Sequence, residues 1–183
     1  MILPIYVVGQ PVLKKVAKDF EIGDDSVTKI IDDMHETMYN ADGIGLAGPQ
    51  VGLSKRIFVI DASPMGDDEP TLKDFKKVFL NAKITERTGE SELIQEGCLS
   101  LPEIREEVPR LEHIKIEYYD ENWNHKIEEY DGFAARVIQH EYDHLDGVLF
   151  VDKLSPLKRR LLKSRLVAIS KGKIATNYRI KPV

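Results

Sequence analysis

The chain has 183 residues, of which 42% are hydrophobic and 31% charged, and these proportions favour a single folded domain over residues 1–183. The formal net charge of -5 excludes a protein whose whole surface binds polyanions, so we expect no DNA partner. The only cysteine cannot form an internal disulfide, and no apolar run approaches the roughly 20 residues that span a bilayer, so we expect a cytoplasmic protein with no membrane partner.

Two helices are predicted in the first quarter of the chain. Residues 11–18 contain a short helix that begins at Pro11, whose fixed φ angle suits the first helical position. Residues 26–40 form a longer amphipathic helix with Ser26 as its cap. Apolar residues recur in it at helical spacing and predict a buried stripe: Val27, Ile30, Ile31, Met34 and Met38.

Strands are predicted for most of the middle of the chain. A surface loop over residues 62–77 interrupts them, and the last two are joined across residues 121–123 as an antiparallel hairpin. The strands cover residues 56–61, 77–85, 90–97, 112–120 and 124–132.

Helices follow at residues 133–145 and 155–170, the second with Ser155 as cap and Pro156 as first residue. Strands and helices do not alternate regularly along the chain. We therefore predict an α+β fold, with mainly antiparallel sheets surrounding the central helix at 133–145 and with a C-terminal helix.

The central helix carries two histidines at metal-binding spacing. His140 and His144 are four residues apart, so both lie on one face, and Glu141 stands between them in the pattern HExxH. In this pattern two imidazoles bind a divalent metal and the glutamate handles protons. We predict a metal site; the alternative is two histidines with ordinary hydrogen bonds near the core.

The third ligand must come from another part of the chain. Downstream of His144 there is no histidine or glutamate, and the only acidic residues are Asp146 and Asp152. Upstream lies Cys98, which could be a small buried hydrophobe but whose thiolate is a good ligand for Zn(II) or Fe(II). Cys98, His140 and His144 would leave a fourth position open for water, which is the arrangement of a catalytic rather than a structural site.

Three stretches, in this order, carry a family resemblance: GIGLAGPQVG (43–52), EGCLS (96–100) and HEYDH (140–144). With them the chain resembles peptide deformylase over essentially its full length. In the first stretch Gly48 replaces the family's second alanine, and we expect this change to loosen the backbone slightly without affecting Gln50. The resemblance implies a hydrolase that removes the N-formyl group from the initiator formyl-methionine of nascent polypeptides and releases formate.

The resemblance also implies a role for each site residue. The cysteine and the two histidines hold the metal, and a metal-bound water attacks the formyl carbon while Glu141 acts as general base and then as general acid. The Gln50 side chain and the Leu99 backbone N–H donate hydrogen bonds to the developing oxyanion. Taken alone, Gln50 could be a loop-stabilising amide and Glu141 the hydrogen-bond partner of a histidine.

A pocket for the methionine side chain is expected beside the metal. Phe133 and Val137 share the face of the central helix that carries His140, so they could form one wall; plain core packing is the alternative. Arg136 lies near this face, and we expect its stem at the mouth of the pocket with its charge in water. The resemblance adds residues that bind the peptide main chain: Ile44, Gly45 and Gly97.

The remaining expectations concern the metal and the partners. The resemblance implies Fe(II), with Zn(II) or Ni(II) able to occupy the site in purified protein. The basic stretch LKRRLLKSR (157–165) is either a solvated helix face or, as the resemblance implies, a surface that binds the ribosome. The alternative functions are another HExxH hydrolase or peptidase, and a binding domain whose structural metal is closed by a fourth protein ligand.

Overall fold

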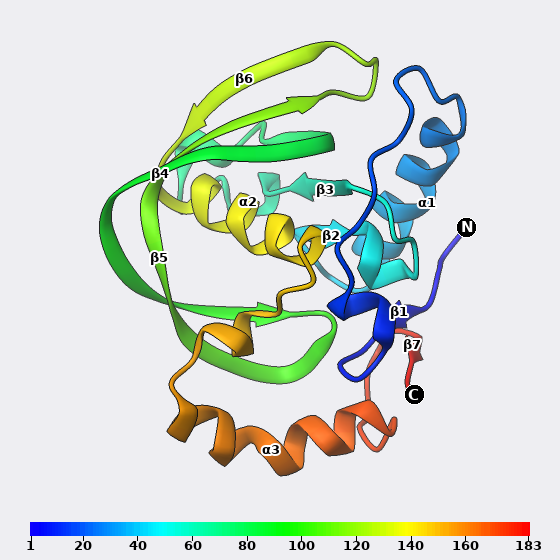
Figure 1. Cartoon of the computed structure of the whole chain (residues 1–183), viewed down its shortest axis with the longest axis vertical. Coiled ribbons are helices and arrows are strands. Elements are labelled where there is room, and N and C mark those ends of the chain that lie inside the picture. Colours follow the sequence, from blue (N-terminus) through cyan, green and yellow to red (C-terminus); the bar gives the residue numbers. More distant parts are fainter.

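The computed structural model describes all 183 residues, and a five-stranded antiparallel sheet in the order β2-β3-β4-β5-β6 organises most of them (Figure 1). Its strands are β2 Gly45–Ala47, β3 Ile57–Asp61, β4 Lys76–Cys98, β5 Leu101–Tyr119 and β6 His125–Tyr130. A separate parallel pair joins β1 (Ile5–Tyr6) to β7 (Ile180–Lys181). The predicted α+β class with antiparallel sheet is confirmed.

Three α-helices complete the fold: α1 Ser26–Asn40, α2 Gly132–Leu145 and α3 Pro156–Ser170. The Ser155 hydroxyl accepts a hydrogen bond from the Lys158 amide at 3.3 Å, as the sequence predicts for the cap of α3. The prediction of Ser26 as the cap of α1 is wrong, because Asp25 occupies that position and Ser26 is the first helical residue. None of the helices has the length and apolar composition needed to cross a membrane.

Strands β4 and β5 are far longer than the sequence predicts. The two strands expected at 77–85 and 90–97 are one continuous strand. Residues 86–89 between them are exposed and have no apolar side chain that would predict a strand. Several register shifts interrupt the β4–β5 pairing, and such bulges bend a strand pair. Figure 1 shows the bent pair curving around α2, so that the helix has strand on both sides.

The core is built on both faces of the sheet. Side chains of β3 alternate between two apolar clusters: Phe58 and Ile60 face the cluster that contains Ile138 of α2, whereas Ile57 and Val59 face the cluster that contains α1. A third cluster joins the start of β5 to α3 and to Val7, the residue that follows β1. Residues 135–145 of α2 are all buried, so any charged group on this helix needs a charged or polar partner.

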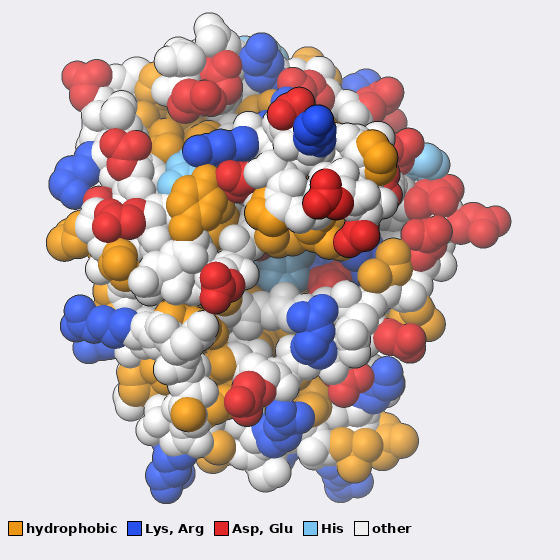
Figure 2. Space-filling model, turned by 180° about the vertical axis from the view of Figure 1, so that it is seen from behind, with side chains coloured by type: hydrophobic (Ala, Val, Ile, Leu, Met, Phe, Trp, Pro, Cys, Tyr) orange, Lys and Arg blue, Asp and Glu red, His pale blue; other side chains and the backbone are white.

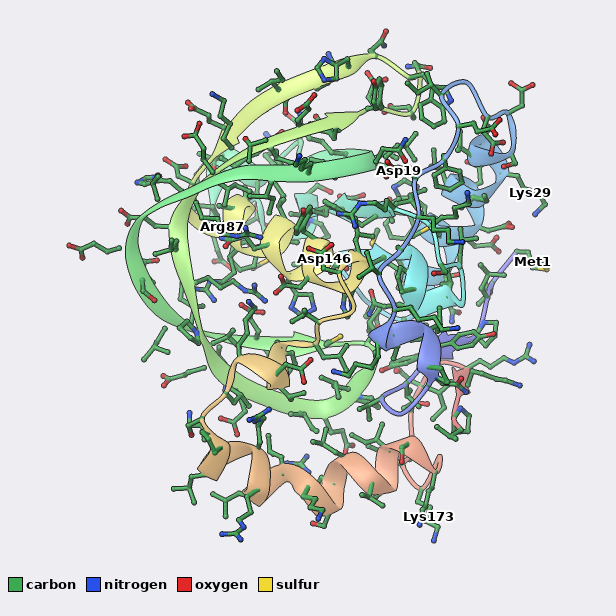
Figure 3. The ribbon with its side chains drawn as sticks, viewed as in Figure 1. Met1, Asp19, Lys29, Arg87, Asp146 and Lys173 are labelled. Carbon is green, nitrogen blue, oxygen red and sulfur yellow. The ribbon has the colours of Figure 1, made fainter.

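The short helix predicted at residues 11–18 is a single 3-10 turn, Pro11–Lys14, that buries Leu13. Residues after α2 also fold locally, with a 3-10 turn at Phe150–Lys153 that leads into α3. Arg56 holds the end of α2 in place, because its guanidinium donates to the Leu145 carbonyl at 3.3 Å and to Asp146, which is labelled in Figure 3, at 2.9 Å.

Candidate functional site

The structure brings together the three predicted metal ligands from two distant elements. Cys98 is the last residue of β4, and His140 and His144 lie on the last two turns of α2. One ligand atom from each residue lies within 4.8 Å of the others. The Cys98 Sγ and the His144 Nε2 are 3.5 Å apart.

This spacing fits a tetrahedral metal ion. With a metal–sulfur bond of about 2.3 Å and a metal–nitrogen bond of about 2.1 Å, tetrahedral geometry separates the two ligand atoms by about 3.6 Å, close to the observed distance. His140 Nδ1–H donates to Glu96 at 2.8 Å, which leaves its Nε2 free as a ligand. The group contains three ligand residues and no fourth, so the donor set of thiolate and imidazoles fits an open site for Zn(II) or Fe(II).

Glu141 follows His140 in the chain, and both residues line one cleft in the surface of the protein. Its side chain is buried, and its Oε2 has no hydrogen-bond partner in the protein. Gly45 of β2 makes room for it, because a Cβ at residue 45 would lie 2.8 Å from the Glu141 carboxyl carbon. A carboxylate with a free oxygen is therefore held against the backbone of β2, in position to accept a proton.

Gln50 is held by the backbone in a fixed orientation. The Ala47 amide donates to Gln50 Oε1 at 2.9 Å, so the Nε2 group must point the other way. That group donates to the Ser100 hydroxyl at 3.2 Å and faces the Cys98 Sγ at 3.5 Å. A side-chain N–H donor thus lies next to Cys98.

A buried ionic network lies behind the histidines. The Glu96 carboxylate accepts from Arg110 at 2.6 and 2.9 Å, from Arg136 at 2.7 Å and from His140 at 2.8 Å. Arg110 also donates to Asp143 at 2.8 Å. The network fixes the orientation of the His140 ring by linking it to two guanidinium groups.

The expectation that the charge of Arg136 lies in water is wrong. Its side chain is 6% exposed and its guanidinium donates to Glu96, to the Val108 carbonyl and to the Glu92 carbonyl. A charge with this many acceptors is stable inside the protein. The stem of Arg136 still lines the cleft.

The pKa values of the two buried glutamates, Glu141 and Glu96, are shifted in opposite directions. Burial raises the pKa of Glu141 to about 7. Burial also acts to raise the pKa of Glu96, but hydrogen bonds from His140 and Arg110 outweigh it and hold that pKa well below its usual range. Glu96 is therefore a permanent carboxylate at neutral pH, whereas Glu141 is poised to exchange a proton.

A cleft of about 880 Å³ opens over the cluster. Figure 2 shows a hollow in the back face of the molecule, with histidine surface at its floor and hydrophobic side chains at its rim. All the residues predicted for the site line this cleft except His144, which lies buried behind it: Ile44, Gly45, Gln50, Gly97, Cys98, Leu99, Phe133, Val137, His140 and Glu141.

Gly48 has a different role from the one expected. A Cβ at residue 48 would lie 2.8 Å from the Lys55 carbonyl and 3.0 Å from the Ile57 side chain. The glycine therefore permits close packing of the 3-10 turn that carries Gln50, and does not loosen it. An alanine here would require the neighbouring backbone to shift.

Several residues of the site have no role assigned from the sequence. Glu96 and Ser100 lie inside the EGCLS stretch, so their closeness to Cys98 in the sequence could have predicted that they belong to the site. The place of Arg110 in the site could not be predicted from the sequence, because an arginine on a strand is ordinarily exposed. Tyr178, which also lines the cleft, lies far along the chain from every motif.

Comparisons with known proteins agree with this geometry. The family model described as polypeptide deformylase matches residues 2–160. A peptide deformylase of Christiangramia forsetii is 55% identical, over 99% of this chain and 96% of the relative, and one of Cytophaga hutchinsonii is 52% identical, over 99% and 97%.

Solved structures show the same likeness. The crystal structure of a peptide deformylase from Thermus thermophilus has a TM-score of 0.82 and 39% identity, over 94% of this chain and all of that one. The enzyme from Thermotoga maritima has a TM-score of 0.76 and 44% identity, over 85% of this chain and 99% of that one. The chain therefore belongs to the polypeptide deformylase family, whose members are metal-dependent enzymes that remove the N-formyl group from nascent polypeptides.

Proposed function

We propose that Cys98, His140 and His144 hold one divalent metal and that Glu141 moves the proton in the hydrolysis of the formyl group. The observation that carries this proposal is a three-ligand cluster beside a buried carboxylate that has one oxygen without a partner. When bound, the metal lowers the pKa of a water molecule and polarises the formyl oxygen. Glu141 takes up the proton of the attacking water and returns it to the amine that leaves.

Two further residues stabilise the negative charge that develops on the formyl oxygen. The Gln50 amide has an N–H group on the cleft side, and the Leu99 backbone lies next to the cysteine ligand. Donors that are fixed before the reaction cost no reorganisation when the charge appears. Gln50 meets this condition, because the Ala47 amide fixes one end of its side-chain amide and Ser100 the other.

The walls of the cleft fit a formyl-methionyl peptide. Phe133 and Val137 contribute apolar surface for the methionine side chain, and Ile44, Gly45 and Gly97 contribute backbone from two strand ends for the peptide main chain. Phe133 lines the cleft and also packs against the apolar cluster under α2, so the two expected roles are compatible.

Replacement of Glu141 by alanine tests the function. We expect formate release from formyl-Met-Ala-Ser to fall by about a hundredfold to ten-thousandfold, because a general acid–base contributes that much. Bound metal should remain, since Glu141 is not a ligand. Turnover is measured as formate and metal by elemental analysis. An active variant, or loss of metal together with activity, would contradict the assigned role.

We further propose Fe(II) as the native metal, because the family resemblance implies it and a site of one thiolate and two imidazoles can hold it. A ferrous thiolate centre is sensitive to oxygen, so the same elemental analysis is done on protein prepared without air. Iron at one equivalent in the active preparation is expected. Zinc or nickel in an equally active anaerobic preparation would overturn the choice of iron.

The basic helix α3 is proposed to bring the enzyme to ribosomes in the cytoplasm, where its substrates emerge. Residues Arg159, Arg160 and Lys163 are exposed and make no ion pair, whereas Lys158 and Arg165 contact Glu106 and the Glu103 carbonyl of β5. Three unpaired cations on one helix suit the phosphates of ribosomal RNA.

A further inference from the structure

The last thirteen residues form a segment that returns from α3 to the cleft. We name residues 171–183 the C-terminal strap. Figure 1 shows the strap leaving the end of α3 and rising to β7, which pairs with β1. The match to the family model ends at residue 160, so nothing in that match describes the strap.

The strap is fastened at several points. The Arg179 carbonyl accepts from the Ile5 amide at 2.9 Å, and the Pro182 carbonyl accepts from the Gln10 side chain at 2.6 Å. Ile174 and Ile180 pack against the apolar cluster under α3. Lys173 points outward from the turn that starts the strap (Figure 3). These contacts fix the strap as a part of the fold.

Part of the strap is a wall of the cleft. Residues 175–178 line the same cavity as His140 and Glu141. The Asn177 side chain donates to Asp42 at 3.4 Å, which connects the strap to the segment that precedes β2. The strap therefore closes one side of the space in which a substrate must bind.

Tyr178 makes the one strap contact with the backbone beside the metal ligands. Its hydroxyl donates to the Leu99 carbonyl at 2.8 Å, and its ring is half-buried. Burial raises the pKa of Tyr178 well above its usual value, so the hydroxyl keeps its proton at neutral pH and remains a donor.

The neighbours of Leu99 are held as well. The Ser100 carbonyl accepts from the Val8 amide at 3.0 Å, and the Ser100 hydroxyl accepts from Gln50. The Leu99 side chain lies against Gly43, where a Cβ would approach it to 2.8 Å. Tyr178 completes this set of contacts, because it is the group that fixes the Leu99 carbonyl.

We propose that Tyr178 is a positioning residue for the deformylation reaction, acting through the Leu99 carbonyl to hold the Leu99 N–H toward the reacting formyl oxygen. This inference rests on the proposed function of the Leu99 N–H as an oxyanion donor. A donor acts best when its peptide cannot rotate away, and the hydroxyl of Tyr178 restrains the peptide on the far side of the Leu99 Cα.

The test is the conservative substitution Tyr178→Phe, which keeps the ring and removes the hydroxyl. We expect kcat for formyl-Met-Ala-Ser to fall about fivefold to tenfold, the worth of one neutral hydrogen bond, while KM changes by less than about twofold. Metal content and the midpoint of thermal unfolding are measured on the same samples. A fall in kcat alone separates positioning from a general structural role.

Tyr118→Phe is the matched control. The Tyr118 hydroxyl donates to Glu128 at 3.0 Å in the β5–β6 hairpin, away from the cleft, so its removal should leave kcat unchanged. An unchanged kcat in Tyr178→Phe, an equal fall in both variants, or a fall that follows metal loss would each overturn the proposal. Absence of formate release from the unmodified enzyme would refute the proposed function itself, which is a different result.

Discussion

At the scale of single residues, the carboxylate of Glu96 accepts more hydrogen bonds than any other group near Cys98, His140 and His144. It accepts four hydrogen bonds, two from Arg110, one from Arg136 and one from His140. An ion network of this kind is costly to break, because each partner left unpaired remains buried. Its contribution to the site is to fix one histidine ring in the orientation that metal binding requires.

Replacement of Glu96 by glutamine should weaken Zn(II) binding by about tenfold to a hundredfold, the usual effect of losing the hydrogen-bond partner of a metal-binding histidine. The affinity is measured by competition with a chelator. Glu106→Gln is the matched control, since Glu106 lies on β5 opposite Glu96, pairs with Lys158 at 3.4 Å and is not among the residues that line the cleft. Equal affinities in the two variants would exclude this role for Glu96.

The cluster of Cys98, His140 and His144 could be predicted from the sequence because these residue types are rare in this chain. One cysteine and one HExxH pattern leave few combinations of soft and imidazole ligands in this chain. The buried state of Arg136 could not be predicted, because its acceptors are Glu96 and two backbone carbonyls of β4 and β5. Only the folded strands bring those acceptors to the helix.

At the scale of elements, helices were easier to predict than strands. The helical spacing of the apolar residues placed α1 closely, and Ser155 with Pro156 placed the start of α3, whereas the solvent-exposed half of β4 has no alternating pattern. The β5–β6 hairpin could be predicted because apolar and polar residues alternate along both of its strands. Asp120 stabilises that turn, accepting from the Asn122 amide and from the amide and side chain of Asn124.

The hairpin turn should make a pH-dependent contribution to stability. Burial acts to raise the pKa of Asp120, but hydrogen bonds from Asn124 and Asn122 outweigh it and lower that pKa. A carboxylate with a lowered pKa in the folded protein stabilises it above the unfolded pKa of about 4, and this stabilisation is lost as the pH falls through the folded pKa.

Asp120→Ala should therefore lower the free energy of unfolding by about 1 kcal/mol at pH 7, a modest amount because solvent screens this partly exposed carboxylate. The difference from the unmodified protein should shrink as the pH falls below about 4. Urea unfolding at a series of pH values measures it. Asp67→Ala, in an exposed loop, serves as control and should show little effect at any pH. A constant difference for Asp120→Ala from pH 7 to pH 3 would refute the electrostatic explanation.

At the scale of the whole molecule, α3 lies at the edge of the fold with most of its surface exposed (Figure 1). Only Leu162 and Ile169 of this helix are buried. Alanine at Arg159, Arg160 and Lys163 should weaken co-sedimentation with ribosomes and reduce its salt dependence by about one unit of slope for each cation.

The control for that variant is alanine at Lys158 and Arg165, whose side chains face β5. We expect this double variant to weaken co-sedimentation less than the triple variant does. Both variants should release formate from a short peptide at the rate of the unmodified enzyme. If the triple variant sediments with ribosomes as the unmodified enzyme does, α3 is a solvated helix and not a docking surface.

The strap also determines when the enzyme can become complete. The ribosome adds residues 171–183 after every other residue that lines the cleft, and domains fold as the chain emerges. Until then β1 has no partner strand, and the Leu99 carbonyl has no tyrosine to hold it. An enzyme that acts on chains still being made therefore completes its own cleft only after residues 171–183 have been synthesised.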